Sequence, residues 1–288
     1  MATTSGDVET RTVNVPGATL YVEVRGTGPV LLCITGGPTD AGVMADLAGR
    51  LADRYTVVTY DQRGHSRSPL DGEPEDIPVS LHADDAAAIL AEVGHEPAYV
   101  YGNSGGASIG LELVVRHPEL VRTLVAHEPP LMQMLPDAER WRATFAHIHE
   151  TYLTQGVFPA MGLFGAAVEE GGPAYSEEMQ KIPPTPESQE MMGRMAGNFD
   201  LFVAHEIPTI NSYVPDVEAL RNAPTHIVSA AGETSGEQSA RRSAFVLAER
   251  LGTPVAYLPG GHGGWGSDPG EFAERVHQAL RGAGTTET

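Results

Sequence analysis

The stretch Tyr99–Gly110, YVYGNSGGASIG, decides the fold of this chain. It runs from an apolar segment typical of a buried strand, through glycines around Ser104, into a segment that favours a helix. Gly102, Ser104 and Gly106 have the spacing G-x-S-x-G. A sharp strand-to-helix turn exposes the side chain at its centre. Only small residues fit beside that side chain because backbone segments crowd there. The spacing therefore predicts an exposed serine hydroxyl at a helix N-terminus.

Such a turn can be purely structural, can hold a phosphate, or can carry a nucleophile. A phosphate loop would have a lysine after its glycines, and none follows here. A nucleophile would have the backbone N–H of Gly105 beside it, where that group can stabilise an oxyanion. The strand and helix context favours the nucleophile, with a structural turn as the alternative.

Short apolar runs alternate with helical patterns over most of the chain. A β-hairpin is indicated at 11–26, and further strands at 29–37, 55–64, 98–106, 122–130, 225–233 and 254–262. Helical patterns occupy 44–54, 81–94, 106–118, 239–252 and 268–282. Strands that alternate with helices are typical of a parallel sheet. We therefore predict an α/β fold with a mostly parallel eight-stranded sheet flanked by helices.

Residues 134–215 break this alternation. Helical patterns at 136–156 and 186–210 flank a segment rich in glycine and proline, and no strand is evident. We predict a helical cap at 134–215, inserted into a core domain made of 1–133 and 216–288. A wall of methionine and aromatic side chains suits an apolar ligand, although packing within the cap is the alternative for each residue. The group comprises Met161, Phe164, Met191, Met192, Met195, Phe199 and Phe202.

Composition limits the partners. The chain has 288 residues with a formal net charge of -20, which repels nucleic-acid phosphates and anionic lipid. We expect no nucleic-acid or membrane partner, no signal peptide and a cytoplasmic location. The single cysteine, Cys33, lies in an apolar run and is expected to be a buried hydrophobe. Residues 1–12 and 283–288 are expected to be loose tails, and the oligomeric state, a homodimer included, stays open.

A serine nucleophile needs a base. Of eleven histidines, His262 follows a late apolar run and lies in a glycine-rich loop before the last helix. His65, in a loop after a strand, is the alternative that could border the site. The second oxyanion donor is expected in the loop ITGGPT, from Gly37 first and Gly36 second. We expect no cofactor and no metal, since HIHE (147–150) has the spacing of a solvated helix.

Four motifs together resemble the α/β-hydrolase family. They are TGGP (35–38), YDQRGHSRS (60–68), GNSGG (102–106) and GGH (260–262), and they occur in the family's order over nearly the whole chain outside the cap. The resemblance implies an enzyme in which Ser104 is the nucleophile and His262 is the base. It also implies an oxyanion hole built from backbone N–H groups.

The acid of the triad departs from the family's usual position. That position, after the seventh strand in the pattern G-x-x-D, is Ser235 here, and serine cannot balance an imidazolium. Glu233 stands two residues earlier and is one substitute. Glu128, at the turn that ends TLVAHEPPL, is the other, and we favour it. The alternative for Glu128 is a surface turn residue.

With Glu128 as the acid, the resemblance narrows. VAHEPP, VEALR (217–221) and YLPGGHGGWGSDPGEFA are similar to segments of the fungal zearalenone lactonases, although the cap matches poorly. This resemblance implies a serine hydrolase that cleaves a carboxylic ester or lactone through an acyl-enzyme, with a zearalenone-type macrolactone as the best single substrate. A cap tryptophan packs on the substrate in those enzymes, and Phe202 is its nearest counterpart. Trp265 completes the predicted substrate-binding residues, with Met161, Phe164, Met192 and Met195.

Two other functions stay open. GGP with DQRG also resembles the proline iminopeptidases, which carry a tryptophan after the nucleophile and an aspartate at the late position. Gly105 and Ser235 stand at those places here. Such an aminopeptidase would need cap carboxylates, for which Glu169, Glu170 and Glu206 are the candidates. The other alternative is a non-enzymatic small-molecule receptor on the same fold.

Overall fold

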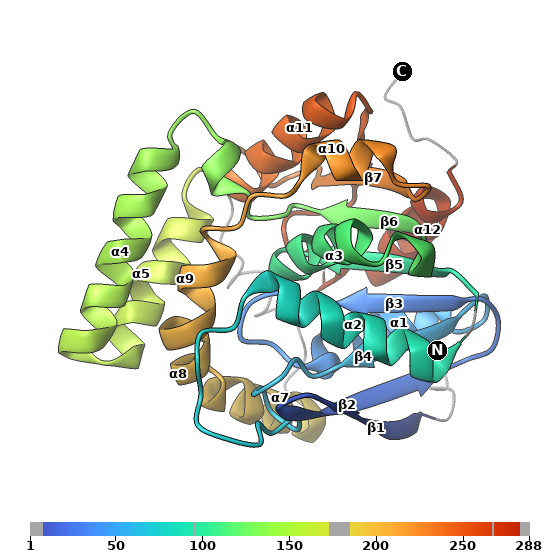
Figure 1. Ribbon diagram of the computed structural model, residues 1–288, viewed down its shortest axis with the longest axis horizontal. Helices are drawn as coiled ribbons and strands as arrows, with labels where there is room; N and C mark the ends of the chain where they lie inside the picture. The colour runs from blue at the N-terminus through green and yellow to red at the C-terminus, as the bar shows by residue number, and fades with distance from the viewer. Residues whose placement is uncertain (1–7, 95, 173–184, 267, 283–288) are drawn as a thin grey trace.

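The computed structural model describes residues 8–94, 96–172, 185–266 and 268–282 (Figure 1). Of the predicted tails, residues 1–7 and 283–288 lie outside the described part. The prediction of a tail was wrong for residues 9–12, which belong to the first strand, β1 (Glu9–Val15). They pair with β2 (Ala18–Arg25) in antiparallel register, Glu9 opposite Val24, so backbone hydrogen bonds order this part of the chain.

One sheet of eight strands runs through the molecule in the order β1-β2-β4-β3-β5-β6-β7-β8. The strands β1, β2 and β4 are antiparallel neighbours, and the other pairs are parallel, which confirms the predicted fold class. The remaining strands are β3 (Val30–Ile34), β4 (Thr56–Tyr60), β5 (Ala98–Asn103), β6 (Val121–His127), β7 (His226–Gly232) and β8 (Val255–Leu258).

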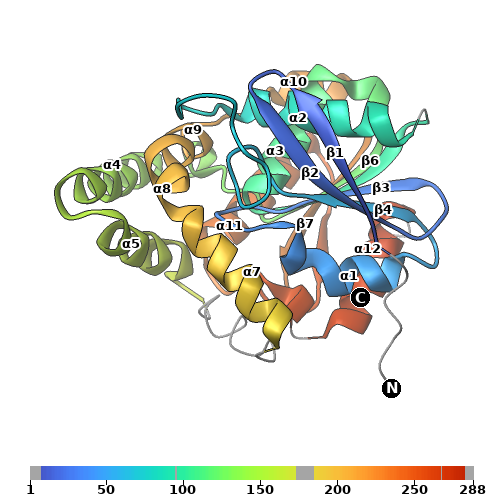
Figure 2. The ribbon, with the colours of Figure 1, turned by 90° about the horizontal axis from the view of Figure 1, so that it is seen from below.

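Helices cover both faces of the sheet, so that the molecule has three layers (Figure 2). On one face lie α1 (Ala45–Leu51) and α12 (Pro269–Leu280). On the other lie α2 (Val79–Val93), α3 (Gly105–Arg116), α10 (Val217–Asn222) and α11 (Ser239–Leu251). Successive residues of a strand face opposite layers: Leu32 packs with the α2–α3 layer, and Cys33 with the α1–α12 layer. Cys33 is buried, as predicted, and burial raises the pKa of its thiol to about 12.

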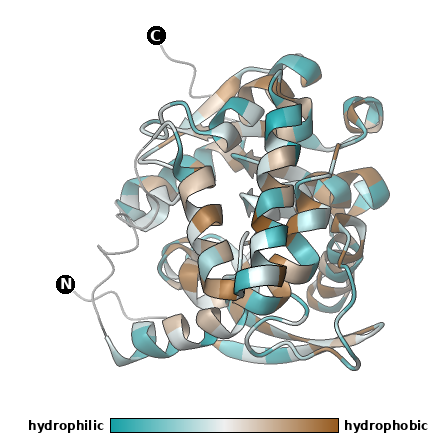
Figure 3. Cartoon of the chain, turned by 90° about the vertical axis from the view of Figure 1, so that its left-hand side faces the viewer, coloured by the Kyte–Doolittle hydropathy of each residue, from teal (hydrophilic) through white to brown (hydrophobic). Residues whose placement is uncertain are grey.

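The chain between β6 and β7 is helical in its described part and gathers at one end of the sheet (Figure 1). The helices are α4 (Ala138–Gln155), α5 (Val157–Glu169), α7 (Pro186–Gly197), α8 (Phe199–Leu201), a π-helical turn Phe202–Glu206, and α9 (Ile207–Ile210). The sequence did not indicate α5, because its apolar residues follow one another with little periodicity. The boundaries of the cap stay a prediction. Hydrophobic and hydrophilic residues alternate along these helices (Figure 3). Among all the described helices, none is long and apolar enough to cross a membrane.

A buried asparagine joins the helices of this region to the loop after β3. Asn198, between α7 and α8, donates from Nδ2 to the carbonyl of Pro38 at 3.2 Å. Its Oδ1 accepts from the backbone N–H of Ser66 at 2.7 Å. Arg194 of α7 adds an ion pair to Asp40 at 2.7 Å. These contacts set the position of the glycine loop that precedes Pro38.

A second buried contact joins the same regions. Nε2 of His65, in the loop after β4, lies 3.2 Å from Oε1 of Glu206 at the end of the π-helical turn. Both side chains are buried, and His82 of α2 lies 3.6 Å from the same oxygen. His65 was the predicted alternative that could border the site, but the structure buries it in this ion pair.

Each partner of this pair favours the charged form of the other. Burial is the largest single influence on His65 and lowers its pKa, but the charge and hydrogen bond of Glu206, with smaller contributions from Thr39 and Asp61, together outweigh burial and raise the pKa. Burial is likewise the largest single influence on Glu206 and raises its pKa, but the charge and hydrogen bond of His65, with the fields of His82 and His205, together lower it. For His82 burial prevails and lowers the pKa to about 4, so this ring stays neutral near neutral pH. A buried charged pair therefore anchors the π-helical turn to the core.

We predict that Glu206→Gln destabilises the fold most between pH 4.5 and 6.5, the ordinary pKa values of the two groups. The raised pKa of His65 gives stability below its ordinary value that is lost as the pH rises. The lowered pKa of Glu206 gives stability above its ordinary value that is lost as the pH falls. Urea unfolding of wild type and variant should differ by about 1.5–3 kcal/mol inside this window and by less on either side. A difference independent of pH would contradict the charged pair.

The turn between β5 and α3 depends on glycines because other backbone crosses it closely. A Cβ on Gly106 would lie 2.1 Å from the carbonyl oxygen of Ile34, and one on Gly102 would lie 2.5 Å from that of Gly106. We predict that Gly106→Ala lowers the free energy of unfolding by about 3 kcal/mol or more, because backbone must move. The matched control is Gly49→Ala, at an open position of α1, which should stabilise by about 0.5–1 kcal/mol. Equal effects in urea unfolding would show that the crossing is not tight.

Candidate active site

Ser104 lies at the turn from β5 into α3 with φ 55° and ψ −127°, a backbone conformation that non-glycine residues rarely adopt. Its backbone N–H donates to the carbonyl of His127 at 2.9 Å, which holds the turn against β6. Three described non-glycine residues have positive φ: Ser66, Ser104 and Glu128. Such conformations persist only where surrounding contacts enforce them, and they are common at functional sites.

Glu128 follows β6 directly and is fully buried. Its Oε2 lies 2.7 Å from Nδ1 of His262, and its Oε1 accepts from the backbone N–H of Gly232 at 2.8 Å. Its own backbone N–H donates to the carbonyl of Ala230 at 3.0 Å. The carboxylate is thus held at both oxygens by β7 and by the loop after β8.

The carboxyl of Glu128 is ionised at neutral pH. Burial by itself would raise its pKa, but the hydrogen bond and charge of His262, with the field of His127, outweigh burial and lower the pKa to about 2. An ionised carboxylate can only accept, so the proton of the neutral His262 ring is held at Nδ1 and Nε2 keeps its lone pair. That is the tautomer a general base requires.

The other candidate for the acid does not reach His262. Glu233 is 46% exposed and lies 3.4 Å from Arg275 at the surface. Ser235, at the usual position of the family's acid, is fully buried beside Gly232: a Cβ on that glycine would meet its Oγ at 2.5 Å. Of the two carboxylates considered, the structure brings only Glu128 to His262.

The glycines predicted for the oxyanion hole lie against the nucleophile turn. A Cβ on Gly36 would approach the backbone nitrogen of Gly105 to 2.4 Å and the Cβ of Ser104 to 2.7 Å. Gly37 has φ 64° and open space around it, and all three glycines line the same cavity as Ser104 and His262. Only residues without a side chain allow this close approach.

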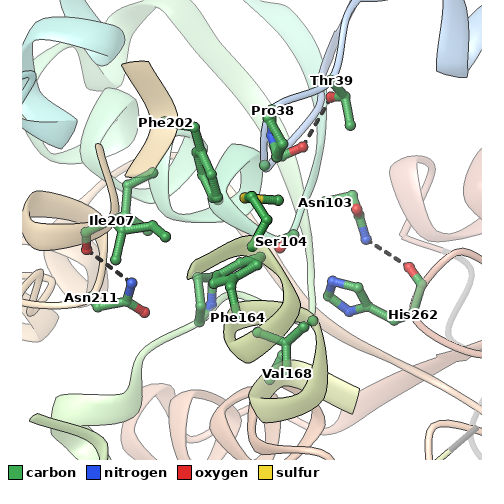
Figure 4. Close-up of a pocket in the computed structure, with 18 of the residues that line it drawn as sticks. Pro38, Thr39, Asn103, Ser104, Phe164, Val168, Phe202, Ile207, Asn211 and His262 are labelled. Atoms are coloured by element: carbon green, nitrogen blue, oxygen red, sulfur yellow. Dashed lines mark hydrogen bonds between the residues drawn. The ribbon is translucent and has the colours of Figure 1, made fainter. Parts of the chain in front are cut away.

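The cavity measures about 580 Å³ and lies between the strand ends and the helices that follow β6 (Figure 4). Its wall is mostly apolar and includes five of the predicted substrate-binding residues: Met161, Phe164, Met192, Met195 and Phe202. Phe202 and Phe164 pack edge to face with ring centroids 5.1 Å apart. Phe199 also lines the cavity, whereas Met191 is buried with the α1–α12 layer.

The prediction that Trp265 binds substrate is not matched by its position. Trp265 is only 7% exposed and packs edge to face on Phe272 of α12, with centroids 6.1 Å apart. It is not among the residues that line the cavity. The ring belongs to the core of the α1–α12 layer, a direction that the sequence pattern does not encode.

The sequence did not predict the polar residues that line the cavity beside Ser104 and His262. Asn103, Asn211, Thr39 and Ser239 line the cavity with Ser104 and His262. Asn103 directly precedes the nucleophile, so its place in the motif was a usable signal. Asn211 follows α9 and donates from Nδ2 to the carbonyl of Ile207 at 2.9 Å (Figure 4). No sequence motif predicts this contact.

The three carboxylates considered for an aminopeptidase do not converge. Glu169 lines the cavity, Glu170 pairs with Arg140, and Glu206 is buried against His65. In the described part of the chain, no group of three histidine, cysteine or acidic side chains is arranged to hold a metal ion.

Comparison with known proteins agrees with this architecture. The model of the alpha/beta hydrolase fold family matches residues 29–222. An uncharacterised hydrolase of Bacillus subtilis, YraK, is 38% identical over 278 residues, which cover 93% of this chain and 95% of that protein.

Solved structures share the fold at low sequence identity. A thermophilic esterase from Thermogutta terrifontis superposes with a TM-score of 0.72 at 17% identity, covering 96% of this chain and 100% of that one. The enol-lactonase from Burkholderia xenovorans has a TM-score of 0.71 at 16% identity, covering 95% and 100%. The family match over more than half of the chain and the Bacillus relative over nearly all of it show that this protein is a hydrolase of the α/β-hydrolase family.

Proposed function

We propose that this hydrolase cleaves a carboxylic ester or lactone of a mainly apolar small molecule through an acyl-enzyme. The observation that carries the proposal is the 2.7 Å contact of His262 Nδ1 with the buried Glu128, in a cavity that Ser104 and His262 both line. A serine, an oriented imidazole and a charged carboxylate are the parts that acyl transfer needs.

In the first half of the reaction, Ser104 Oγ attacks the carbonyl carbon while His262 Nε2 takes the hydroxyl proton. The tetrahedral oxyanion is stabilised by the backbone N–H of Gly105 and that of Gly37, with Gly36 as the alternative donor. The C–O bond to the leaving oxygen then breaks, and His262 returns the proton to that oxygen. An alcohol leaves, or stays tethered when the substrate is a lactone, and Ser104 carries the acyl group.

In the second half, water attacks the acyl-enzyme and His262 takes its proton. The ester bond to Ser104 breaks, and the proton passes to Oγ. Glu128 stays ionised throughout and stabilises the imidazolium that forms twice in each cycle. The products are a carboxylic acid and an alcohol, or one hydroxy acid from a lactone.

A zearalenone-type macrolactone is the finer proposal for the substrate. Its support is the motif resemblance around Glu128 and the mostly apolar wall, which includes the aromatic rings of Phe202 and Phe164. Esterase and enol-lactonase are the activities named for two proteins that share the fold. A negative chain also suits a neutral substrate better than an anionic one.

We predict that the wild-type protein releases acid from at least one ester or lactone in a pH-stat assay. The panel contains zearalenone, short and medium acyl esters, smaller lactones and proline amides. Ser104→Ala should abolish turnover while ligand binding, followed by calorimetry, persists, because only the nucleophile is lost. Turnover by Ser104→Ala equal to wild type would overturn the mechanism.

The outcome of the panel also separates the alternatives. Cleavage of simple esters without zearalenone keeps the mechanism and discards the macrolactone. Cleavage of proline amides alone favours the aminopeptidase. Tight binding of a panel compound without turnover favours a receptor.

We predict that Glu128→Gln lowers kcat by about 10⁴-fold, as the loss of a triad acid does, because the amide no longer stabilises the imidazolium. Glu233→Gln is the matched control, since its carboxylate lies at the surface beside Arg275, and its kcat should stay within about 2-fold of wild type. Steady-state kinetics on the best panel substrate would decide, and a large loss in Glu233→Gln alone would reverse the assignment of the acid.

A further inference from the structure

We infer that Asn103 is a positioning residue, whose side-chain amide holds the main chain of His262 so that the imidazole stays aligned with Ser104. The inference rests on the proposed function, because it concerns the geometry of the same site. It assigns to the residue before the nucleophile a role separate from the nucleophile, the base and the acid.

The loop that carries His262 is rich in glycine. Gly260 and Gly261 precede His262, and Gly263 and Gly264 follow it. Glycine has more backbone freedom than any other residue, so holding this loop in one conformation requires contacts from outside it. The carboxylate of Glu128 holds the ring at Nδ1, and the carbonyl of Gly260 accepts from the backbone N–H of Thr234 at 2.9 Å.

Asn103 supplies a contact at the backbone. Its Nδ2 donates to the carbonyl oxygen of His262 at 3.0 Å (Figure 4). Asn103 is the last residue of β5, is 4% exposed, and is adjacent to Ser104 in the chain. The nucleophile and the anchor of the base therefore leave the same rigid strand end, so a movement of one is a movement of both.

A buried histidine lies beside the amide of Asn103. The Nδ2 of Asn103 also lies 3.2 Å from Nδ1 of His127, its partner residue on β6. The hydroxyl of Tyr101 lies 3.0 Å from the same nitrogen. His127 is fully buried, and burial lowers the pKa of its ring to about 4, so the ring is neutral near neutral pH. The amide nitrogen of Asn103 thus lies within hydrogen-bond distance of the His262 carbonyl and of a buried, neutral ring.

The end of β6 connects the acid, Glu128, to these contacts. His127 precedes Glu128, and the carbonyl of His127 accepts from the N–H of Ser104 at 2.9 Å. A chain of buried contacts therefore joins the turns that carry Ser104 and Glu128 to the loop that carries His262. Without the amide, the pair of His262 and Glu128 survives, but the position of Nε2 relative to Ser104 is less well defined. Because misplacement by about 1 Å can lower a rate about 10²-fold, the loss falls on the chemical step.

The test compares Asn103→Ala and Asn103→Asp with Thr225→Val. Asn103→Asp keeps the shape of the side chain but presents an oxygen to the carbonyl of His262. Thr225 is the matched control: it is buried and donates to the carbonyl of Val121 at 2.8 Å, beyond the other end of β6. The first measurement is the second-order rate of labelling by an alkyl fluorophosphonate, in which Ser104 Oγ bonds to phosphorus, fluoride leaves and His262 takes the proton. The second is kcat and KM on the best panel ester.

We predict that both Asn103 variants label and turn over about 10- to 100-fold more slowly than wild type, with KM within about 2-fold. Thr225→Val should label at the wild-type rate. Rates are compared at a temperature at which each variant is folded, as thermal unfolding shows. One folded Asn103 variant is enough for the comparison with wild type.

Wild-type labelling in a folded Asn103 variant would overturn the inference, and so would a raised KM with unchanged kcat, which would make Asn103 a substrate contact. A loss of the same size in Thr225→Val would also overturn it, since the effect would then be general destabilisation. If wild type itself neither reacts with the fluorophosphonate nor cleaves any ester, the proposed function fails, and this inference fails with it. That result differs from the three above, which compare variants of an active protein.

Discussion

The contact between the buried carboxylate of Glu128 and the ring of His262 is the interaction on which the rest of the site depends. A carboxylate buried away from water needs hydrogen bonds in place of its lost hydration. Here a backbone N–H of β7 at 2.8 Å and the imidazole at 2.7 Å provide them. Because β5, β6 and β7 are neighbours in the sheet, the turns after the first two and the backbone of the third lie side by side. Glu128 follows β6 and Glu233 follows β7, so both stand at this edge of the sheet. The direction of each side chain decides which carboxylate serves His262: Glu128 turns to the imidazole and Glu233 to Arg275.

Close backbone approach is the second constraint. Gly36 lies against Gly105, and Gly106 lies against Ile34, so the loop after β3 and the turn after β5 meet with no room for a Cβ. Ser104 and Glu128 both have positive φ at the ends of adjacent strands. This strain is maintained by the hydrogen bonds between β5, β6 and β7 around it, which is how a rigid sheet presents side chains in conformations that a loop would not keep.

The sequence predicted much of this, for physical reasons that can be named. Runs such as 98–103 and 121–127 are mostly apolar because both faces of a parallel strand are buried, and the glycines around Ser104 mark a crowded turn. Trp265 was misplaced because an aromatic residue in a glycine-rich loop can turn toward a cavity or toward the core, and local pattern is the same for both. α5 was missed because one side lines the cavity, so its apolar residues do not form a single stripe.

The sequence by itself determined the strand and helix order, the nucleophile turn and the late histidine, because each is a local pattern set by backbone sterics and periodic burial. It left two carboxylates for the acid, and only the tertiary structure decided between them, since that choice depends on distances between strands far apart in the chain. The same holds for the anchor of His262 at Asn103 and for the ion pair of His65 with Glu206. Contacts of this kind form only when the sheet brings its carboxyl ends to one edge and the helices after β6 close over them.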